Sequence, residues 1–272
     1  ILDKMGAALD GQTKHAVVIK ESVTEQPPLP FSISALKTYC SDKFNLRPED
    51  TLKITQALRM KYGGLITYNR SECRYIPTNM HPDAPDVIEA VKHNLGESMN
   101  YNGIDPSRMS RAFNDENTSV HHAIIPTAQK ADLSEMPETE RLVYSAICGF
   151  YMIQFMPPCQ KERTRLTIAG TGGNKFEAVS TVITSNGFRD ILDTKDDEHG
   201  FLSDVPAGEY DALMSNPVVT EKETKPPKRY TDSSLEEDMK SIAKYVTDPE
   251  IKRLLLLKDK DSKEEHGSIG TA

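Results

Sequence analysis

Two proline-rich connectors constrain the fold of this chain most strongly, because the stretches that they separate have different secondary-structure patterns. The first is Gln26–Pro30, in which the prolines push their preceding residues out of the helical region. The second is Pro157–Pro158, which ends a long helical pattern. Outside the connectors, β-branched or alternating residues predict strands over His15–Val23, Arg163–Ala169 and Lys175–Thr184, with a hairpin turn between the last two.

Helical patterns dominate the stretch between the connectors. Ser32 or Ser34 can cap a first helix, and Gly63–Gly64 stops a second. Two short helices followed by a β segment are typical of a helix-turn-helix arrangement. The first predicted helix begins at Ile33, and the second runs from Glu49 to about Tyr62, with Met60 on its apolar stripe. Two more are predicted over Pro85–Leu95 and over Pro137–Phe155, with Leu142 facing inward in the latter. Beyond the second connector, helices are predicted over Leu235–Tyr245, capped by Ser233, and over Pro249–Lys258.

The composition excludes several classes of protein. A formal net charge of −8 argues against a generally basic nucleic-acid coat, although local charge can still bind DNA. The four cysteines lie far apart without a Cys-x-x-Cys pair, so we expect buried, reduced, intracellular thiols rather than a disulfide or zinc framework. No long apolar run is present, which predicts neither a membrane span nor a secretory signal.

Leu65–Pro77 combines in one short segment the side chains that phosphodiester cleavage needs. An apolar run leads to Tyr68, and Arg70, Glu72 and Arg74 follow at alternate positions. A free phenol has a pKa of about 10, so it attacks a phosphodiester only with help from a cation or base. Arginine suits phosphate oxygens, because its planar guanidinium stays charged and donates in pairs. In a strand, Tyr68 and Arg70 would lie on the same face.

Four segments resemble the motifs of type IA DNA topoisomerases, and the closest resemblance is to the topoisomerase III branch. Ile66–Tyr75 (ITYNRSECRY) resembles the active-site tyrosine segment, and His121–Thr127 (HHAIIPT) resembles the second motif. Thr220–Thr231 resembles a third motif, and Gly267–Ala272 resembles the start of a fourth. The four segments occur in the family's order over nearly the whole chain, which makes the match specific.

The resemblance implies a mixed α+β fold with several domains. An antiparallel β arch domain, residues 1–28 and 156–218, would be discontinuous, since the chain leaves it and returns. A helical, winged-helix-like domain over residues 29–155 would be inserted in the arch and carry the tyrosine. Residues 219–272 would form part of a helical base domain.

The resemblance assigns catalysis to Tyr68 and Arg70. Tyr68 would attack single-stranded DNA and become linked to the 5′ side of the break, leaving a 3′ hydroxyl. Exchange of one ester for another conserves bond energy, so rejoining needs no ATP. Arg70 would hold the scissile phosphate as its negative charge develops. His121 matches the family histidine that contacts DNA near the break, whereas His122 has no such match and is expected to be structural.

Supporting roles follow for the residues around the two catalytic side chains. Thr67 and Arg74 are expected to support the site or contact DNA, and Thr271 in the fourth motif would help to frame the tyrosine. Glu72 stands where the family more often has aspartate, and Asn69 replaces a proline of the topoisomerase III branch. Glu72 can still orient Arg70 or a water molecule. The side chain of Asn69 is expected to point away from that of Tyr68.

The expected metal chemistry lies outside this sequence. Type IA enzymes hold the general acid and the Mg²⁺-binding carboxylates in an N-terminal toprim domain, as an Asp-x-Asp pair after an apolar strand. Asp193–Asp197 has clustered acids but lies in a polar, turn-like run. We therefore expect no metal or cofactor site in this chain and no DNA relaxation by it alone. The start at Ile1 and the end within a motif predict an internal fragment.

Other expectations follow from the family. The partners would be single-stranded DNA and a RecQ-type helicase or a single-strand-binding protein, in the cytoplasm and at the nucleoid. The alternative hypothesis is a non-catalytic helix-turn-helix DNA-binding module, in which Tyr68 packs and Arg70 and Arg74 hold phosphates. A phosphotyrosyl-forming recombinase fits less well, because those enzymes cluster several basic residues around the tyrosine at other spacings.

Overall fold

The chain divides into two compact units. The computed structural model describes residues 9–192, 200–218, 220–227, 229–240 and 242–261. Unit 1 comprises Ile1–Gln26, Pro158–Arg189 and Asp193–Lys228, and unit 2 comprises Pro27–Pro157, Asp190–Leu192 and Arg229–Ala272. The chain thus passes between the units at Pro27 and at Pro158, within the two proline-rich connectors. The assignment of arch, tyrosine and base domains stays a prediction.

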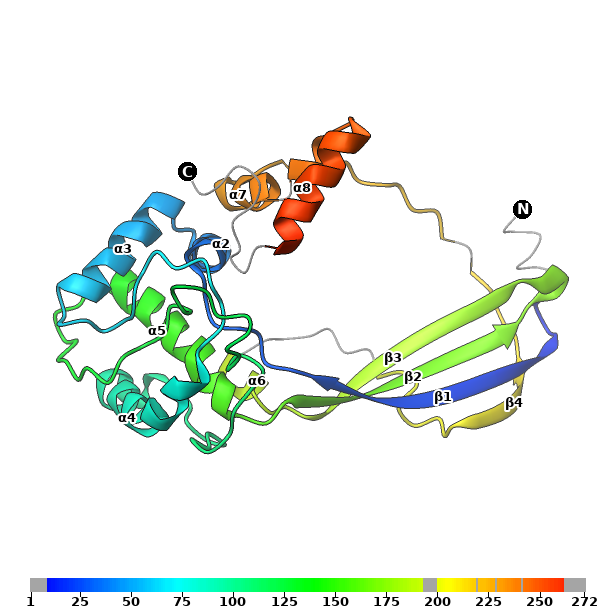
Figure 1. The fold of residues 1–272 in the computed structure, drawn as a ribbon. Coiled ribbons are helices and arrows are strands. Elements are labelled where there is room, and N and C mark those ends of the chain that lie inside the picture. The colour runs from blue at the N-terminus through cyan, green and yellow to red at the C-terminus, as the bar shows by residue number, and fades with distance from the viewer. Residues whose placement is uncertain (1–8, 193–199, 219, 228, 241, 262–272) are drawn as a thin grey trace. The chain divides into compact units, whose positions relative to one another are not determined.

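Unit 1 is built on a four-stranded antiparallel sheet with the strand order β3-β2-β1-β4 (Figure 1). The strands are β1 (Thr13–Glu25), β2 (Cys159–Ala169), β3 (Lys175–Ser185) and β4 (Gly208–Leu213). The hairpin turn between β2 and β3 was predicted, and Gly172 and Gly173 have the positive φ angles that such a turn favours. The mixed fold with an antiparallel sheet is therefore confirmed.

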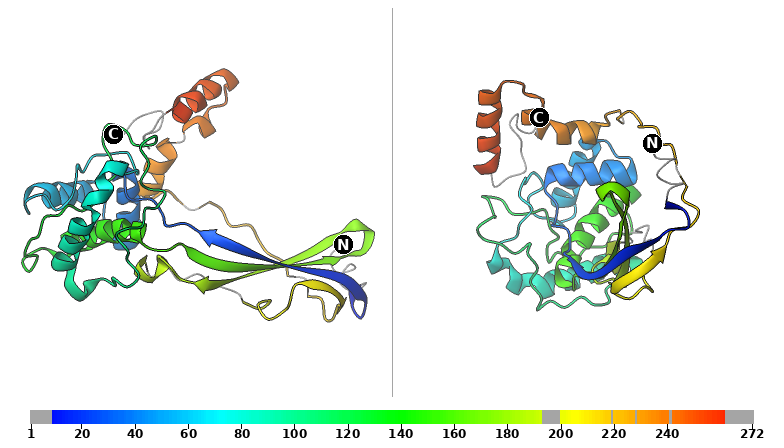
Figure 2. Two further views of the ribbon diagram at one scale, coloured as in Figure 1. Left: turned by 60° about the horizontal axis from the view of Figure 1, so that its bottom comes forward. Right: turned by 90° about the vertical axis from the view of Figure 1, so that its right-hand side faces the viewer.

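Unit 2 is mainly helical (Figure 2). Its core comprises buried side chains from several helices and from the segments between them, including Leu36, Leu58, Ile124, Tyr144 and Phe155. The helices are α2 (Ile33–Phe44), α3 (Pro48–Met60), α4 (Ala84–Leu95), α5 (Glu138–Met152), α7 (Asp232–Lys240) and α8 (Pro249–Asp261), and the short α6 (Arg189–Leu192) crosses the boundary between the units.

The helix predictions hold except in some details of their faces and ends. Ser32 is the cap of α2, because its hydroxyl accepts a hydrogen bond from the Ala35 N–H at 3.1 Å. Met60 and Leu142 were predicted on apolar faces, yet they are 67% and 38% exposed. Met60 ends α3, and Leu142 lies in the first turns of α5, where the helix surface meets solvent. Ser233 was predicted to cap a later helix, but α7 begins at Asp232, and Thr231 caps it, because the Thr231 hydroxyl accepts from the Ser234 N–H at 3.2 Å.

Two strand predictions between the connectors are wrong: the β segment after the second helix, and the buried strand that the apolar run Ala123–Ile125 predicts. Isolated bridges, not strands, join Ile66 to Pro126 and Phe31 to Ile124. Pro126 has no N–H to donate, so a regular ladder cannot continue through it. Tyr68 and Arg70 consequently lie in irregular backbone, and strand alternation does not determine which way their side chains point.

The cysteine side chains have the buried environment that the sequence predicted. All four cysteines are free and buried. Burial raises the pKa of Cys40 to about 12, so this thiol stays protonated at neutral pH. None of the helices in the described part of the chain has the length and apolarity needed to cross a bilayer.

Candidate active site

The tyrosine segment is anchored to α3 directly after that helix ends. Gly63 and Gly64 have φ angles of +76° and +90°, which L-residues with a side chain rarely adopt, and they reverse the chain. The Leu65 N–H then donates to the Leu58 carbonyl at 3.1 Å. Farther along, the Asn69 amide donates to the buried Thr55 hydroxyl at 3.3 Å. The segment that carries Tyr68 is therefore fixed to α3 on both sides of the tyrosine.

Two side chains lie against the half-buried ring of Tyr68. The ring centroid of His121 is 4.3 Å from that of Tyr68, with an angle of 35° between the planes. The guanidinium carbon of Arg59, in the last turn of α3, is 4.9 Å from the Tyr68 centroid. Ring packing and a cation near the ring both restrict where the phenol can move. The fold thus brings Tyr68 and His121 together, and it adds Arg59, which sequence reasoning missed.

Thr67 connects the tyrosine segment to the histidine segment. Its hydroxyl donates to the Ala123 carbonyl at 3.1 Å and accepts from the Ile125 N–H at 3.1 Å. Its N–H also donates to the Ile125 carbonyl at 3.0 Å. These bonds take the place of the predicted strand pairing, because the Thr67 hydroxyl bonds to backbone groups that would pair with a neighbouring strand in a regular ladder. Thr67 therefore sets the position of Tyr68 relative to His121.

Arg70 is exposed and follows Tyr68 in a turn. Within the part of the chain that the structure describes, its guanidinium makes no hydrogen bond, ion pair or ring contact. Its side chain is thus not committed to a carboxylate, and it is not held against Tyr68 either. An exposed guanidinium beside a phenol is able to bind an anionic ligand in pairs of hydrogen bonds.

Glu72 and Arg74 hold the scaffold of the site. Glu72 is only 8% exposed, and its Oε1 accepts from the Ser34 hydroxyl at 3.0 Å in the first turn of α2. A carboxylate is favourable there because the N-terminus of a helix carries partial positive charge. Arg74 donates from Nε and Nη2 to the carbonyls of Pro30 and Leu29, each at 2.9 Å. Contacts of either residue with DNA stay a prediction.

His122 is half-buried, unlike the exposed His121. Its Nδ1 lies 2.9 Å from the Ala123 carbonyl oxygen. Burial lowers the pKa of His122 below its ordinary value, and the neighbouring His121 lowers it further, while the carbonyl contact acts in the opposite direction. The unfolded chain therefore binds a proton at this position at a higher pH than the folded chain does. Folding stability is lost as the pH falls through about 6.5.

We expect His122→Gln to weaken the loss of stability at mildly acidic pH, because glutamine does not titrate. The measurement is the urea midpoint of unfolding at about pH 7.5 and at about pH 5.5. The exposed His93 provides the matched control, so His93→Gln should keep the wild-type difference between the two midpoints. An equal pH dependence in wild type and His122→Gln would show that His122 does not cause it.

The remaining predicted site segments lie outside the described residues, and the described residues hold no cluster of three metal-ligating side chains. Thr271 and the Gly267–Ala272 motif lie outside the described residues, and so does all of Asp193–Asp197. Among the residues that the structure does describe, His, Cys, Asp and Glu side chains form no group of three that could hold a metal ion. We derive no chemical step through a metal here.

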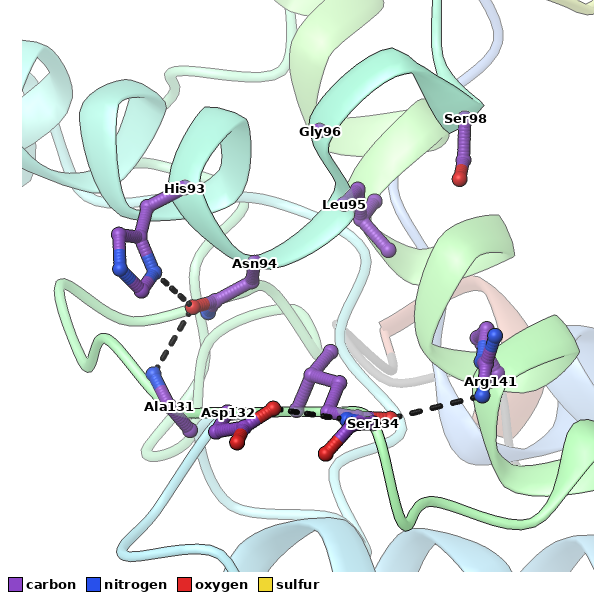
Figure 3. Close-up of a pocket in the computed structure, with 10 residues that line it drawn as sticks. His93, Asn94, Leu95, Gly96, Ser98, Ala131, Asp132, Ser134 and Arg141 are labelled. Carbon is purple, nitrogen blue, oxygen red and sulfur yellow. Dashed lines mark hydrogen bonds between the residues drawn. The ribbon is translucent and has the colours of Figure 1, made fainter.

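Two pockets in unit 2 lie apart from the tyrosine ring, and Tyr68 lines neither. The larger, of about 520 Å³, is at the C-terminal end of α4 (Figure 3). In it, Asn94 Oδ1 accepts from the Ala131 N–H, and Arg141 donates to the Leu133 carbonyl. These two polar side chains are thus hydrogen-bonded within the pocket wall, and the bonds do not point to an anion-binding site. The smaller cavity, of about 280 Å³, has Thr67 in its wall.

The geometry around Tyr68 suits nucleophilic chemistry on an anionic substrate. A phenol, an imidazole and a guanidinium meet at the ring, and a second guanidinium is exposed two residues away. Of these groups, the hydroxyl is the one able to act as a nucleophile, and nearby cations stabilise negative charge on it. The neighbouring carboxylate of Glu72 is buried and accepts a hydrogen bond from Ser34, which suits a supporting role.

Comparisons with known proteins agree with one another. A family model described as DNA topoisomerase matches residues 3–272. "DNA topoisomerase 3" of Vibrio cholerae is 31% identical over 259 residues, which cover 94% of this chain and 40% of that protein. "DNA topoisomerase 3" of Haemophilus influenzae is 32% identical, covering 85% of this chain and 36% of that protein.

A solved structure shows a similar fold. Full-length topoisomerase I from Thermotoga maritima matches with a TM-score of 0.57 and 21% identity, covering 92% of this chain and 41% of that one. At this identity the likeness concerns the fold alone. The chain spans about two fifths of the length of the Vibrio cholerae and Thermotoga maritima proteins.

Proposed function

Because the chain belongs to the type IA DNA topoisomerase family, we propose that it carries the tyrosine-bearing part of an enzyme that cleaves and rejoins single-stranded DNA. The observation that supports this most is the position of the Tyr68 ring, next to His121 and Arg59 and two residues before an uncommitted Arg70. These groups are what a phenol needs in order to attack a phosphodiester.

Tyr68 is the nucleophile of the proposed reaction. Its oxygen bonds to the scissile phosphorus, and the bond from phosphorus to the 3′ oxygen of the neighbouring sugar breaks. The phenol proton leaves and the 3′ oxygen gains one, so the products are a 5′-phosphotyrosine and a 3′ hydroxyl. Rejoining is the reverse exchange of esters and needs no ATP. Passage of a second strand between the two steps changes the topology of the DNA.

Arg70 and His121 act on the phosphate. Arg70 binds the two non-bridging oxygens as negative charge develops, and its exposure leaves it accessible to DNA. His121, exposed beside the ring, donates to a phosphate oxygen when it is protonated. Thr67, Glu72 and Arg74 support these groups through the hydrogen bonds described above. By the family resemblance, Thr271 would help to frame the tyrosine.

The domain architecture of the family accounts for the two units. We assign the sheet of unit 1 to the arch and the α2–α5 region of unit 2 to a winged-helix-like tyrosine domain inserted in it. The segment after residue 218 belongs to the base domain. By resemblance to the family, we assign the general acid and the Mg²⁺ ligands to a toprim domain outside residues 1–272. When bound there, Mg²⁺ would help to place the DNA phosphates.

The proposed partners and location follow from this activity. Single-stranded DNA is the substrate, and a RecQ-type helicase or a single-strand-binding protein would supply or protect it. The enzyme would act in the cytoplasm, at the nucleoid. The helix-turn-helix alternative, a module that binds DNA without cutting it, is kept as an outcome of the tests.

The experiment that tests the proposal is covalent capture of an end-labelled single-stranded oligonucleotide by the full-length gene product with Mg²⁺, after denaturation by detergent. We expect label at the 3′ end to stay with the protein and label at the 5′ end to be released, because the tyrosine takes the 5′ phosphate of the downstream fragment. Residues 1–272 alone should neither capture DNA nor relax a negatively supercoiled plasmid.

The outcomes separate the hypotheses. Capture of the 5′ label instead would contradict the polarity of attack. Binding without any capture would favour the non-catalytic module. Robust relaxation by residues 1–272 alone would show that the metal-binding groups have been wrongly assigned to a domain outside them.

A further inference from the structure

Arg59 is a cation that the mechanism above does not use. It lies in the last turn of α3, is half-buried, and has its guanidinium carbon 4.9 Å from the centroid of the Tyr68 ring. Within the described chain its guanidinium makes no hydrogen bond and no ion pair. No carboxylate in that part of the chain neutralises its charge, and the aromatic ring that it contacts is that of Tyr68.

The contact between Arg59 and Tyr68 is imposed by the backbone and by buried side chains. The bonds from Leu65 to Leu58 and from Asn69 to Thr55 fix the tyrosine segment to the same helix that carries Arg59. Leu58 and Thr55 are both completely buried, so the part of the helix that receives the segment is rigid. This arrangement keeps the Tyr68 ring within reach of the Arg59 side chain.

The charge of Arg59 matters more during the attack than before it. A neutral phenol ring attracts a cation only through its quadrupole. Once the proton leaves, the ring carries a full negative charge, and a guanidinium at this distance attracts it by Coulomb's law in a partly buried site. Such an interaction is stronger in the transition state than in the ground state, which is the condition for raising a rate.

We propose that Arg59 is a positioning residue for Tyr68. The Arg59 guanidinium holds the Tyr68 ring beside His121 and stabilises the negative charge of the phenolate during the attack. The inference rests on the proposed function, since it assigns a second cation to the same nucleophile. It gives the two arginines different tasks. Arg70 serves the phosphate, and Arg59 serves the phenol.

The test uses Arg59→Met in the full-length gene product, because methionine keeps much of the length and apolar packing without the charge. We expect the single-turnover rate of covalent capture to fall about tenfold or more, whereas Arg59→Lys should recover most of that loss. The affinity for a single-stranded oligonucleotide, measured in a Tyr68→Phe background in which cleavage is blocked, should change by less than about twofold. Arg59→Gln provides a second neutral variant should the methionine variant fold poorly.

Lys61 offers a matched control. It lies at the end of the same helix, and its Nζ is 4.8 Å from the centroid of the Tyr62 ring, so it pairs a cation with a different tyrosine. Lys61→Met should capture DNA at the wild-type rate. The inference is overturned if the neutral Arg59 variants match wild type, if Lys61→Met loses as much, or if affinity falls in parallel with the rate.

The failure of this inference can be told from the failure of the proposed function. If Tyr68→Phe abolishes capture while both neutral Arg59 variants retain it, only the role of Arg59 is wrong. If Tyr68→Phe captures DNA as wild type does, the proposed function itself is wrong.

Discussion

Tyr68→Phe is expected to abolish covalent capture of single-stranded DNA by the full-length gene product. The substitution removes one oxygen and leaves the ring, so the contacts with His121 and Arg59 remain. Tyr68 is half-buried and its hydroxyl makes no hydrogen bond with the residues that the structure describes, so the free energy of unfolding should change by less than about 0.5 kcal/mol. The measurement compares trapped protein–DNA adduct in wild type and variant, with oligonucleotide affinity recorded in parallel.

Tyr75 provides the control for this substitution. It lies seven positions later in the same segment, is also half-buried, and has no ring contact with His121 among the described residues. Tyr75→Phe should therefore form adduct as wild type does. Retained binding with complete loss of adduct in Tyr68→Phe alone supports the nucleophile. Equal adduct in both variants would assign the chemistry to another residue.

Arg70→Ala is expected to lower the rate of covalent capture by about 100-fold to 1,000-fold, which is typical for removal of a donor to a developing oxyanion. Arg70→Lys should recover only part of the rate, because an ammonium keeps the charge but cannot bind two phosphate oxygens through a planar fork. Since Arg70 is exposed and makes no described contact, the thermal midpoint should stay near that of wild type. Single-turnover capture and thermal unfolding are the two measurements.

Arg47 is the matched control for Arg70. It is also exposed, and it forms an ion pair with Asp50 at 2.9 Å at the start of α3. Arg47→Ala should leave the capture rate unchanged, which separates a local role from the loss of a positive charge in general. A capture rate for Arg70→Ala within about twofold of wild type would contradict the phosphate-binding role.

The sequence predicted most of the helices because proline, glycine and serine mark their ends. Ser32 caps α2 and Pro48 begins α3, as their local chemistry favours. The segments around Tyr68 and Ala123 were predicted as strands because apolar residues cluster there. Their backbone instead forms isolated bridges, which Thr67 reinforces with its side chain. Hydrogen bonds from a side chain to the backbone do not require the alternating pattern of residues that distinguishes a strand in a sequence.

Strand β4 was not predicted for a related reason. It pairs with β1 at the edge of the sheet, and most of its residues are exposed, including Tyr210 and Leu213. A short edge strand that buries little apolar surface lacks the alternation from which strands are predicted.

The candidate site was predictable only as far as its residue types and motifs allow. Tyr68, Arg70 and His121 follow from the motif resemblance, and the structure places the first and third in contact. Arg59 has no motif to mark it, because its contact depends on a chain reversal at Gly63 and Gly64. A basic residue in the last turn before a Gly–Gly helix stop was the one available signal.

The measurement that tests the central claim most directly is the mass of the peptide that carries DNA after cleavage. The full-length gene product is incubated with a single-stranded oligonucleotide and Mg²⁺, denatured, and digested with protease and nuclease. We predict a nucleotide phosphate on the peptide that contains Tyr68 and on no other tyrosine peptide. A nucleotide found on a different residue, or a covalent adduct that persists in Tyr68→Phe, would contradict the account.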